Sequence, residues 1–180
     1  MAPGKQPSRR FLPRYAKCTN FVNADLIAQG IAPLRPESAS IRAGRLVLRE
    51  IEQYRWQNVD FAFETTLSGR AHLRVIHTLK ESGYAIHYFY LWLPTVELSL
   101  SRIAGRVMEG GHDVPSVDVR RRYERSLENF FVHYLPLADS CMVFDNAGGE
   151  PEQIALARKG RIQIVSEARF KPLASRYRNA

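Results

Sequence analysis

Cysteine is scarce in this sequence, and long apolar runs are missing. The 180 residues contain two cysteines, Cys18 and Cys141, whose separation does not match the spacing of metal ligands. The longest apolar tract, residues 84–93, is interrupted by His87 and is far shorter than the ~18 residues of a membrane helix. We therefore expect no membrane segment and no metal site, and we expect Cys141 to be a small core residue.

Acidic residues are nearly absent from both ends of the chain. Residues 1–18 hold five basic side chains and no acid, and residues 158–180 hold seven basic residues and one acid, Glu167. Subtracting their charges, +5 and +6, from the net charge of +8 leaves −3 for residues 19–157. Basic ends around an acidic body favour solubilising tails over a nucleic-acid surface. We therefore predict an irregular basic segment at 1–18 and a basic tail at 167–180.

The first residues also lack the marks of a targeting segment. No apolar stretch follows the basic side chains near the start, as a secretory signal would require. Three prolines within the first 13 residues argue against the amphipathic helix of a transit peptide. We expect a cytoplasmic protein.

Strand-like and helix-like segments alternate between residues 19 and 166. Short apolar runs predict strands, and apolar positions at helical spacing predict helices between them. The predicted strands are 19–23, 59–63, 84–93 and 141–144, the predicted helices are 36–55, 68–82, 95–110 and 116–134, and residues 153–166 form a predicted hairpin. This order is typical of an α/β domain, here 19–166, with a mainly parallel sheet flanked by helices and a C-terminal hairpin.

Three acidic residues, Asp25, Glu64 and Asp145, follow predicted strands. In α/β sheets, ligands bind beyond the carboxyl ends of the strands, so these carboxylates are candidates for a ligand site. Asp25 can accept a proton from a substrate hydroxyl, or it can be the N-cap of the helix that follows. The residues alone leave both roles open.

Glu64 opens the segment Glu-Thr-Thr-Leu-Ser-Gly-Arg, which ends at Arg70. An acid, two threonine hydroxyls and a guanidinium within seven residues are suited to a polar, anionic ligand. An ordinary loop between a strand and a helix also uses Thr, Ser and Gly. We favour the ligand-binding interpretation because Glu64 directly ends an apolar strand.

Arginines are concentrated between residues 102 and 125: Arg102, Arg106, Arg120, Arg121, Arg122 and Arg125. Arg102 and Arg106 lie four residues apart on one helix face, where like charges repel unless an anion lies between them. Guanidinium groups bind phosphate through paired hydrogen bonds, so two helices joined near Gly110-Gly111 could close on a triphosphate. A solvated basic face is the alternative for some of these arginines.

Four motifs in order resemble the zeta-toxin family, which includes UDP-N-acetylglucosamine kinases. They are Asn23-Ala24-Asp25, then Phe63-Glu64-Thr65-Thr66-Leu67-Ser68-Gly69-Arg70, then Gly110-Gly111-His112-Asp113-Val114-Pro115 with Arg120-Arg121-Arg122, and finally Asp145-Asn146. The match covers about residues 19–165 at the spacing of the family. It implies a P-loop-kinase-like fold and the transfer of a phosphoryl group from ATP, with Mg²⁺, to a hydroxyl of a nucleotide sugar.

The resemblance also implies roles for individual residues. Asp25 is expected to be the general base, and Arg106 and Arg121 are expected at the transferring phosphate. The expected substrate-binding residues are Asn23, Glu64, Thr65, Thr66 and Arg70, and the expected phosphate-binding lid residues are Arg102, His112, Arg120 and Arg122. A small antitoxin protein is a partner that members of the family often have.

One part of the family pattern is missing from the sequence. The family begins with a strand and a Gly-rich loop that ends in Gly-Lys-Ser/Thr and holds the phosphates. Here Gly4-Lys5 is followed by Gln6, and no earlier glycine or strand precedes it. In the topology of the family that first strand is central, between the strand ending at Glu64 and the one ending near Leu93. We therefore expect a gap of two strand spacings, ~10 Å, at this place.

These patterns support three candidate functions. The first is a nucleotide-sugar kinase whose N-terminal strand and loop are missing from this form. The second is a pseudokinase or interaction module that keeps the substrate cleft without binding ATP. The third and least favoured is a nucleic-acid binder that acts through the basic tails.

Overall fold

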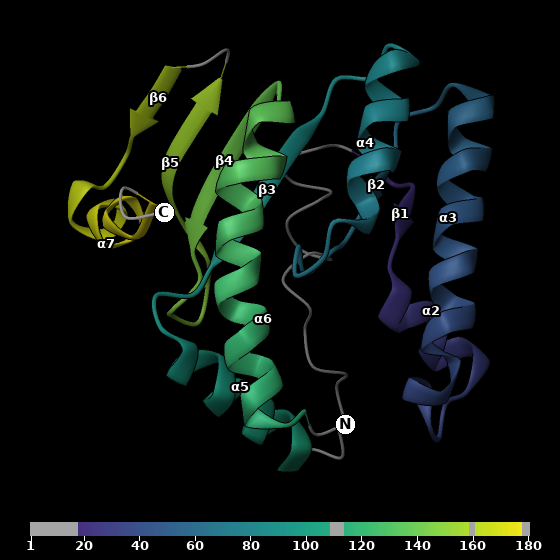
Figure 1. Cartoon of the computed structure of the whole chain (residues 1–180), viewed down its shortest axis with the longest axis horizontal. Helices are drawn as coiled ribbons and strands as arrows, with labels where there is room; N and C mark the ends of the chain where they lie inside the picture. The colour runs from purple at the N-terminus through teal and green to yellow at the C-terminus, as the bar shows by residue number, and fades with distance from the viewer. Residues whose placement is uncertain (1–17, 109–113, 159–160, 178–180) are drawn as a thin grey trace. The chain divides into compact units, whose positions relative to one another are not determined.

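The computed structural model describes residues 18–108, 114–158 and 161–177, which divide into two compact units (Figure 1). The N-terminal unit extends to Thr65, and the C-terminal unit begins at Thr66. His112 and nearly all of the predicted segment 1–18 lie outside the described residues. The predicted domain 19–166 includes parts of both units, and its boundaries stay a prediction.

The N-terminal unit combines two helices with a pair of short strands. Its elements are β1 (Phe21–Val22), α2 (Ala24–Ile31), a 3₁₀ turn (Pro36–Ala39), α3 (Ser40–Gln57) and β2 (Ala62–Phe63). β1 and β2 pair in parallel, with Phe21 opposite Ala62 and Val22 opposite Phe63. Small side chains at Ala28, Ala39 and Ala43 form a buried cluster where α2 meets α3.

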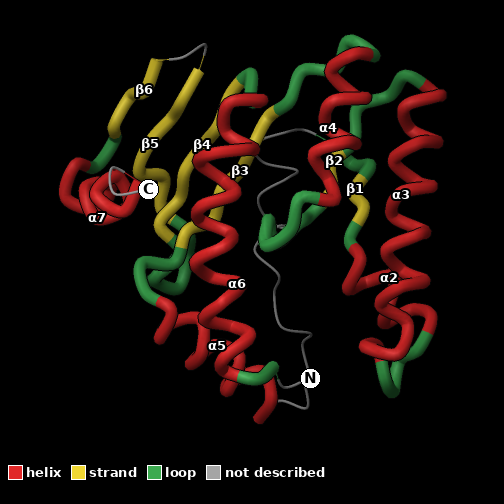
Figure 2. Tube along the Cα trace, in the orientation of Figure 1, coloured by secondary structure: helices red, strands yellow, loops and turns green. Residues whose placement is uncertain are grey.

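The C-terminal unit contains a four-stranded mixed sheet and helices (Figure 2). Its helices are α4 (Ala71–Glu81), α5 (Val96–Met108), α6 (Ser116–Asn129) and α7 (Glu167–Tyr177), with a π-helix (Phe130–Tyr134) and a 3₁₀ turn (Leu135–Leu137) directly after α6. Its strands are β3 (His87–Trp92), β4 (Ser140–Asp145), β5 (Glu152–Arg158) and β6 (Arg161–Ile164). The strand order is β3-β4-β5-β6, with β3 and β4 parallel and the other neighbours antiparallel.

None of the described helices combines the length and the apolarity that crossing a bilayer requires.

Aromatic side chains dominate the core of the C-terminal unit. Phe130, Tyr134 and Phe144 are fully buried. The ring of Phe130 stacks on the ring of Tyr90, with 3.7 Å between centroids and 4° between planes. Cys141 is also fully buried, as predicted, and burial raises the pKa of its thiol to about 12. The residue therefore acts as a small core side chain and not as a reactive thiolate.

The α/β class is confirmed, but only some of the strand pairs are parallel. Parallel pairing occurs in β1–β2 and in β3–β4, whereas the predicted C-terminal hairpin, β5 and β6, extends the second sheet in antiparallel fashion. The described strands form two separate sheets: β1 and β2 make one, and β3 to β6 make the other. The predicted strand at 84–93 begins only at His87, because Gly83 takes a φ of 86° and the chain turns before it extends.

The prediction of a basic tail at 167–180 is wrong for residues 167–177. These residues form α7, and Leu173 is fully buried. Phe170, Leu173 and Ala174 have the i, i+3, i+4 spacing of an apolar helix face, which the many basic neighbours obscure. Most of the basic C-terminus is therefore part of the folded C-terminal unit.

Candidate functional site

The carboxyl ends of β1 and β2 bring two of the predicted site residues together. Asn23 directly follows β1, and Glu64 directly follows β2. The side-chain amide of Asn23 donates a hydrogen bond to Glu64 Oε2 at 2.8 Å. The backbone N–H of Glu64 donates to the carbonyl of Val22 at 3.2 Å and continues the ladder between the strands. Strand pairing thus fixes the backbone at Glu64, and a buried amide holds its carboxylate.

Asp25 is not the cap of the helix that follows β1. That position is taken by Asn23, whose Oδ1 accepts a hydrogen bond from the backbone N–H of Leu26 at 3.0 Å. Asp25 lies in the first turn of α2, is exposed, and makes no hydrogen bond or ion pair with any described residue. Of the two roles that the residues left open for Asp25, the capping role is therefore excluded.

The loop 66–70 carries Thr66 and Arg70 and has an unusual backbone. Leu67 has a φ of 55°, which is rare and strained for a residue with a branched side chain. Its side chain is buried, and its carbonyl accepts a hydrogen bond from Asn129 Nδ2 at 2.8 Å. Two residues later, the carbonyl of Gly69 accepts from the Tyr134 hydroxyl at 2.8 Å. Asn129, the last residue of α6, and Tyr134, which follows this helix, are both buried and hold the loop in its conformation.

Arg70 is connected to the same support. Its Nε donates to Asn129 Oδ1 at 3.4 Å, so one amide contacts both the loop backbone and the arginine. Arg70 itself is exposed, and Thr66 and Ser68 share a hydrogen bond of 2.9 Å between their hydroxyls. The arrangement presents a guanidinium and hydroxyls on a rigid loop, a donor set suited to an anion.

Sequence reasoning missed Asn129 and Tyr134 as supports of this loop. In the sequence, Tyr134 is the last residue of the predicted helix 116–134, and Asn129 is one of its polar residues. The feature of the sequence that could have identified Asn129 is its position directly before Phe130-Phe131, where apolar residues become consecutive. An amide that is 4% exposed beside such a core needs internal partners.

The predicted lid arginines have different environments. Arg120 pairs with Glu97 at 3.0 Å and Arg121 pairs with Asp118 at 2.7 Å, both on the surface. Arg106 and Arg122 are exposed and make no hydrogen bond or ion pair with the described residues. Exposed pairs contribute little stability and break easily, so Arg120 and Arg121 can exchange partners for an anion.

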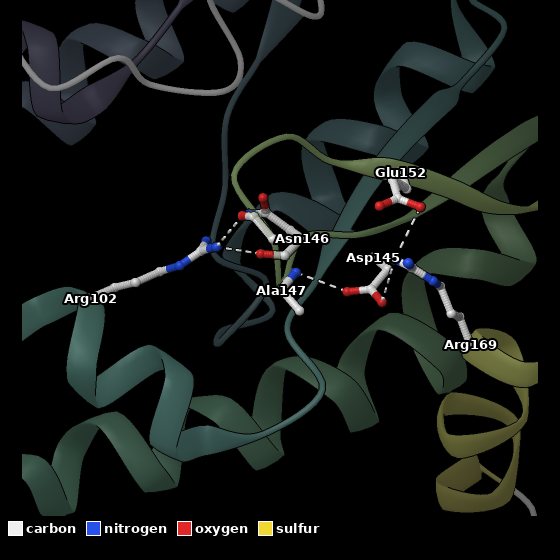
Figure 3. A network of polar contacts seen from close by, with 7 residues as sticks. Arg102, Asp145, Asn146, Ala147, Glu152 and Arg169 are labelled. Atoms are coloured by element: carbon white, nitrogen blue, oxygen red, sulfur yellow. Dashed lines mark hydrogen bonds and ion pairs between the residues drawn. The ribbon is translucent and has the colours of Figure 1, made fainter.

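Arg102 and Asp145 belong to a network at the carboxyl end of β4 (Figure 3). Arg102 donates to the backbone carbonyls of Asn146 and Gly148. The Asp145 carboxylate accepts from the backbone N–H of Ala147 at 2.8 Å and lies 3.5 Å from Arg169 of α7. Arg169 also pairs, at 3.1 Å, with Glu152, which is the first residue of β5. This strand end is therefore occupied by contacts of the protein with itself.

Other concave or metal-binding features do not coincide with the predicted residues. A pocket of about 150 Å³ lies at the amino end of β4 and is lined by Leu135, Cys141 and Ile162 among others, none of them a predicted site residue. In the part of the chain that the structure describes, no group of three or more His, Cys, Asp and Glu side chains could hold a metal ion. The predicted residues thus lie at strand ends in the N-terminal unit and, separately, on the loop 66–70 of the C-terminal unit, and not in this pocket.

The chain is similar to a known bacterial protein. An uncharacterized protein of Haemophilus influenzae is 36% identical to this chain over 102 residues, which are 57% of this chain and 73% of that protein. The chain belongs to the family of this H. influenzae protein. No family model and no solved structure matches the chain. The H. influenzae relative carries no stated activity, so function must be inferred from the residues and their geometry.

Proposed function

We propose that this protein is a phosphotransferase of the zeta-toxin type that acts on a hydroxyl of a nucleotide sugar, such as UDP-N-acetylglucosamine. The observation that carries the proposal is that Asn23 and Asp25, which both follow β1, have different roles. Asn23 caps α2, which leaves the carboxylate of Asp25 exposed and without a partner among the described residues. A carboxylate fixed by a helix turn, but not used by the fold, can take the proton of an acceptor hydroxyl.

The Asn23–Glu64 pair supports a substrate-binding role for this strand end. A carboxylate accepts hydrogen bonds through two oxygens, and sugar hydroxyls are donors that can use them. The 2.8 Å hydrogen bond from a buried amide restricts Glu64 to a narrow set of conformations. Side chains held in this way recognise a ligand with a smaller loss of entropy on binding.

The loop 66–70 supports recognition of an anionic group. Leu67 is kept at a positive φ by its own burial and by Asn129, and strain of this kind is concentrated at functional loops. Arg70 and Thr66 are exposed on this loop. By resemblance, we assign both to binding of the substrate, with Asn129 and Tyr134 as positioning residues.

Mg²⁺–ATP is the phosphoryl donor that the resemblance implies. The described residues contain neither a Gly-rich cradle nor a cluster of metal ligands. They therefore do not fit Mg²⁺–ATP, and we derive no step through it; the proposal for these residues concerns the acceptor side.

A second candidate function is that of a module that binds the nucleotide sugar but not ATP. Titration calorimetry of the 180-residue chain with UDP-N-acetylglucosamine and, separately, with Mg²⁺–ATP tests both functions. We expect binding of the nucleotide sugar to weaken at least about 10-fold in Glu64→Gln and in Arg70→Ala. Glu37→Gln, an exposed acid in the 3₁₀ turn, is the matched control. Failure of the wild type to bind would remove both candidates.

Turnover distinguishes the two candidates further. If the gene product transfers phosphate from ATP to the nucleotide sugar, Asp25→Asn should lower the rate about 100-fold, because the general base is lost. Asp60→Asn, an exposed acid of the same unit, should leave the rate unchanged. Near-normal turnover of Asp25→Asn would show that Asp25 is not the base.

A further inference from the structure

Helix α3 has an apolar stripe on the face that its own unit does not bury. Ile41 is 72% exposed, Leu48 is 49% exposed and Trp56 is 76% exposed. They are seven and eight residues apart, so at about 100° per residue they fall on one side of the 18-residue helix. The opposite side carries the buried residues Ala43, Val47 and Ile51. The helix is therefore apolar on two faces, and only one of them is covered within the unit.

Two opposite charges alternate with the apolar residues of this stripe. Reading along α3, the stripe is Ile41, Arg45, Leu48, Glu52 and Trp56, with steps of four, three, four and four residues. Steps of three and four keep these residues on one side of the helix, as along a seam between packed helices. Arg45 is exposed and has no hydrogen bond or ion pair with the described residues, and the side chain of Glu52 is 49% exposed.

Two copies of the stripe match each other when they run in opposite directions. In an antiparallel pair of α3 helices with a two-fold axis beside Leu48, residues equally distant from the axis face each other. Ile41 then faces Trp56 of the second copy, and Arg45 faces Glu52 of the second copy. Symmetry produces each of these contacts twice, with the two Leu48 side chains at the centre.

We propose that α3 is the interface of a symmetric homodimer, in which the helices of two copies pack antiparallel through this stripe. The charge balance of the N-terminal unit permits it, since residues 19–65 contain five basic and six acidic residues. Glu52 already pairs with Arg55, whose Nε lies 3.0 Å from Oε2. A carboxylate can accept from a second arginine, and an exposed pair within one helix is easily rearranged.

The size of the stripe sets the expected affinity. A helix of 18 residues is about 27 Å long. One such helix pair buries less than the ~1,200 Å² typical of stable complexes, so the dimer should be reversible, with a Kd on the order of 10–100 µM. Sedimentation equilibrium from about 5 to 300 µM covers this range.

A charge exchange across the two-fold axis tests the register. Arg45→Glu and Glu52→Arg each place like charges opposite one another twice, and each should weaken the dimer at least about 10-fold. The double variant Arg45→Glu/Glu52→Arg restores opposite charges and should return the Kd to within about threefold of the wild type. Arg35→Glu makes the same charge change at an exposed residue of the same unit outside α3, and should have no effect. Circular dichroism and thermal unfolding check that each variant is folded.

Three results would overturn the proposal. They are a wild-type chain that stays monomeric at about 300 µM, single variants that behave like Arg35→Glu, and a double variant as weak as the single ones. Co-sedimentation of a monomeric wild type with phosphatidylserine vesicles would instead assign the stripe to a membrane surface.

Discussion

The two units place carboxylates at the ends of parallel strands, but they use them differently. In the N-terminal unit, the carboxylate of Glu64 accepts a hydrogen bond from the buried amide of Asn23, and Asp25 has no partner among the described residues. In the C-terminal unit, the side chain of Asp145 is 8% exposed, accepts from a backbone N–H and pairs with Arg169. The strand-end rule identifies both places equally well. Their partners differ, which supports our proposal that the first is available to a ligand, whereas the second serves the fold.

The largest effect on stability should come from the buried support of the loop 66–70. Asn129→Ala removes the buried donor to the Leu67 carbonyl and releases a strained residue. We expect a loss of about 3 kcal/mol in the free energy of unfolding, measured by urea denaturation. Arg70→Ala, which removes only the exposed partner of the same amide, should cost less than about 1 kcal/mol. Equal effects of the two variants would show that the amide does not hold the loop.

The comparison of the two carboxylates is tested directly by truncating each one. Asp145→Ala removes the acceptor of the Ala147 N–H and one of the two carboxylates that pair with Arg169, and should cost about 2 kcal/mol. Asp25→Ala removes an exposed side chain with no described partner and should change the stability by less than about 0.5 kcal/mol. A similar loss in both variants would contradict the distinction between a structural and an available strand end.

Local sequence pattern predicted where these carboxylates lie but not what contacts them. Asp145 follows an apolar strand, which is visible in the sequence, whereas Arg169 is 24 residues away in a helix that its basic composition disguised as a tail. Asn129 and Leu67 are separated by 62 residues. Partners at such distances depend on how elements pack, and periodicity carries no information about that.

The capping role shows a second limit of sequence reasoning. Asn23 and Asp25 both have side chains suited to an N-cap, and they are two residues apart. Which one caps depends on where the helix begins, and sequence signals place helix ends only to within one or two residues. Pairing of β1 with β2 decides the matter here, because it keeps Val22 extended and lets the helix begin directly after Asn23.

Asn23 has two functions, and substitution can separate them. Asn23→Ala removes both the cap of α2 and the hydrogen bond to Glu64, and should cost about 1 kcal/mol. Asn23→Ser keeps a capping oxygen but not the amide, so it should lose less than half as much in the same urea titration. If Ser and Ala cost the same, the contact with Glu64 and not the cap carries the stability.

Asp139 provides an intermediate case, because it is exposed yet has partners. The backbone N–H of Ile86, 2.7 Å away, and then the ammonium of Lys80, 3.2 Å away, hold the pKa of this carboxyl below its usual value. A lowered pKa in the folded state means that the carboxylate stabilises the protein fully above the pKa of the unfolded chain, near 4. This contribution disappears as the pH falls through the folded pKa.

Replacing Asp139 should therefore have a small effect that depends on pH. Because the side chain is 46% exposed, Asp139→Asn should cost no more than about 1 kcal/mol at pH 7, and the difference from the wild type should shrink at pH 3. Lys80→Met should retain most of the pH dependence, since the N–H of Ile86 is the larger cause. A difference that is the same at both pH values would mean that the charge of Asp139 contributes nothing. Asp139 would then resemble Asp25 in its contribution to stability, and hydrogen-bond partners alone would not distinguish a structural carboxylate from an available one.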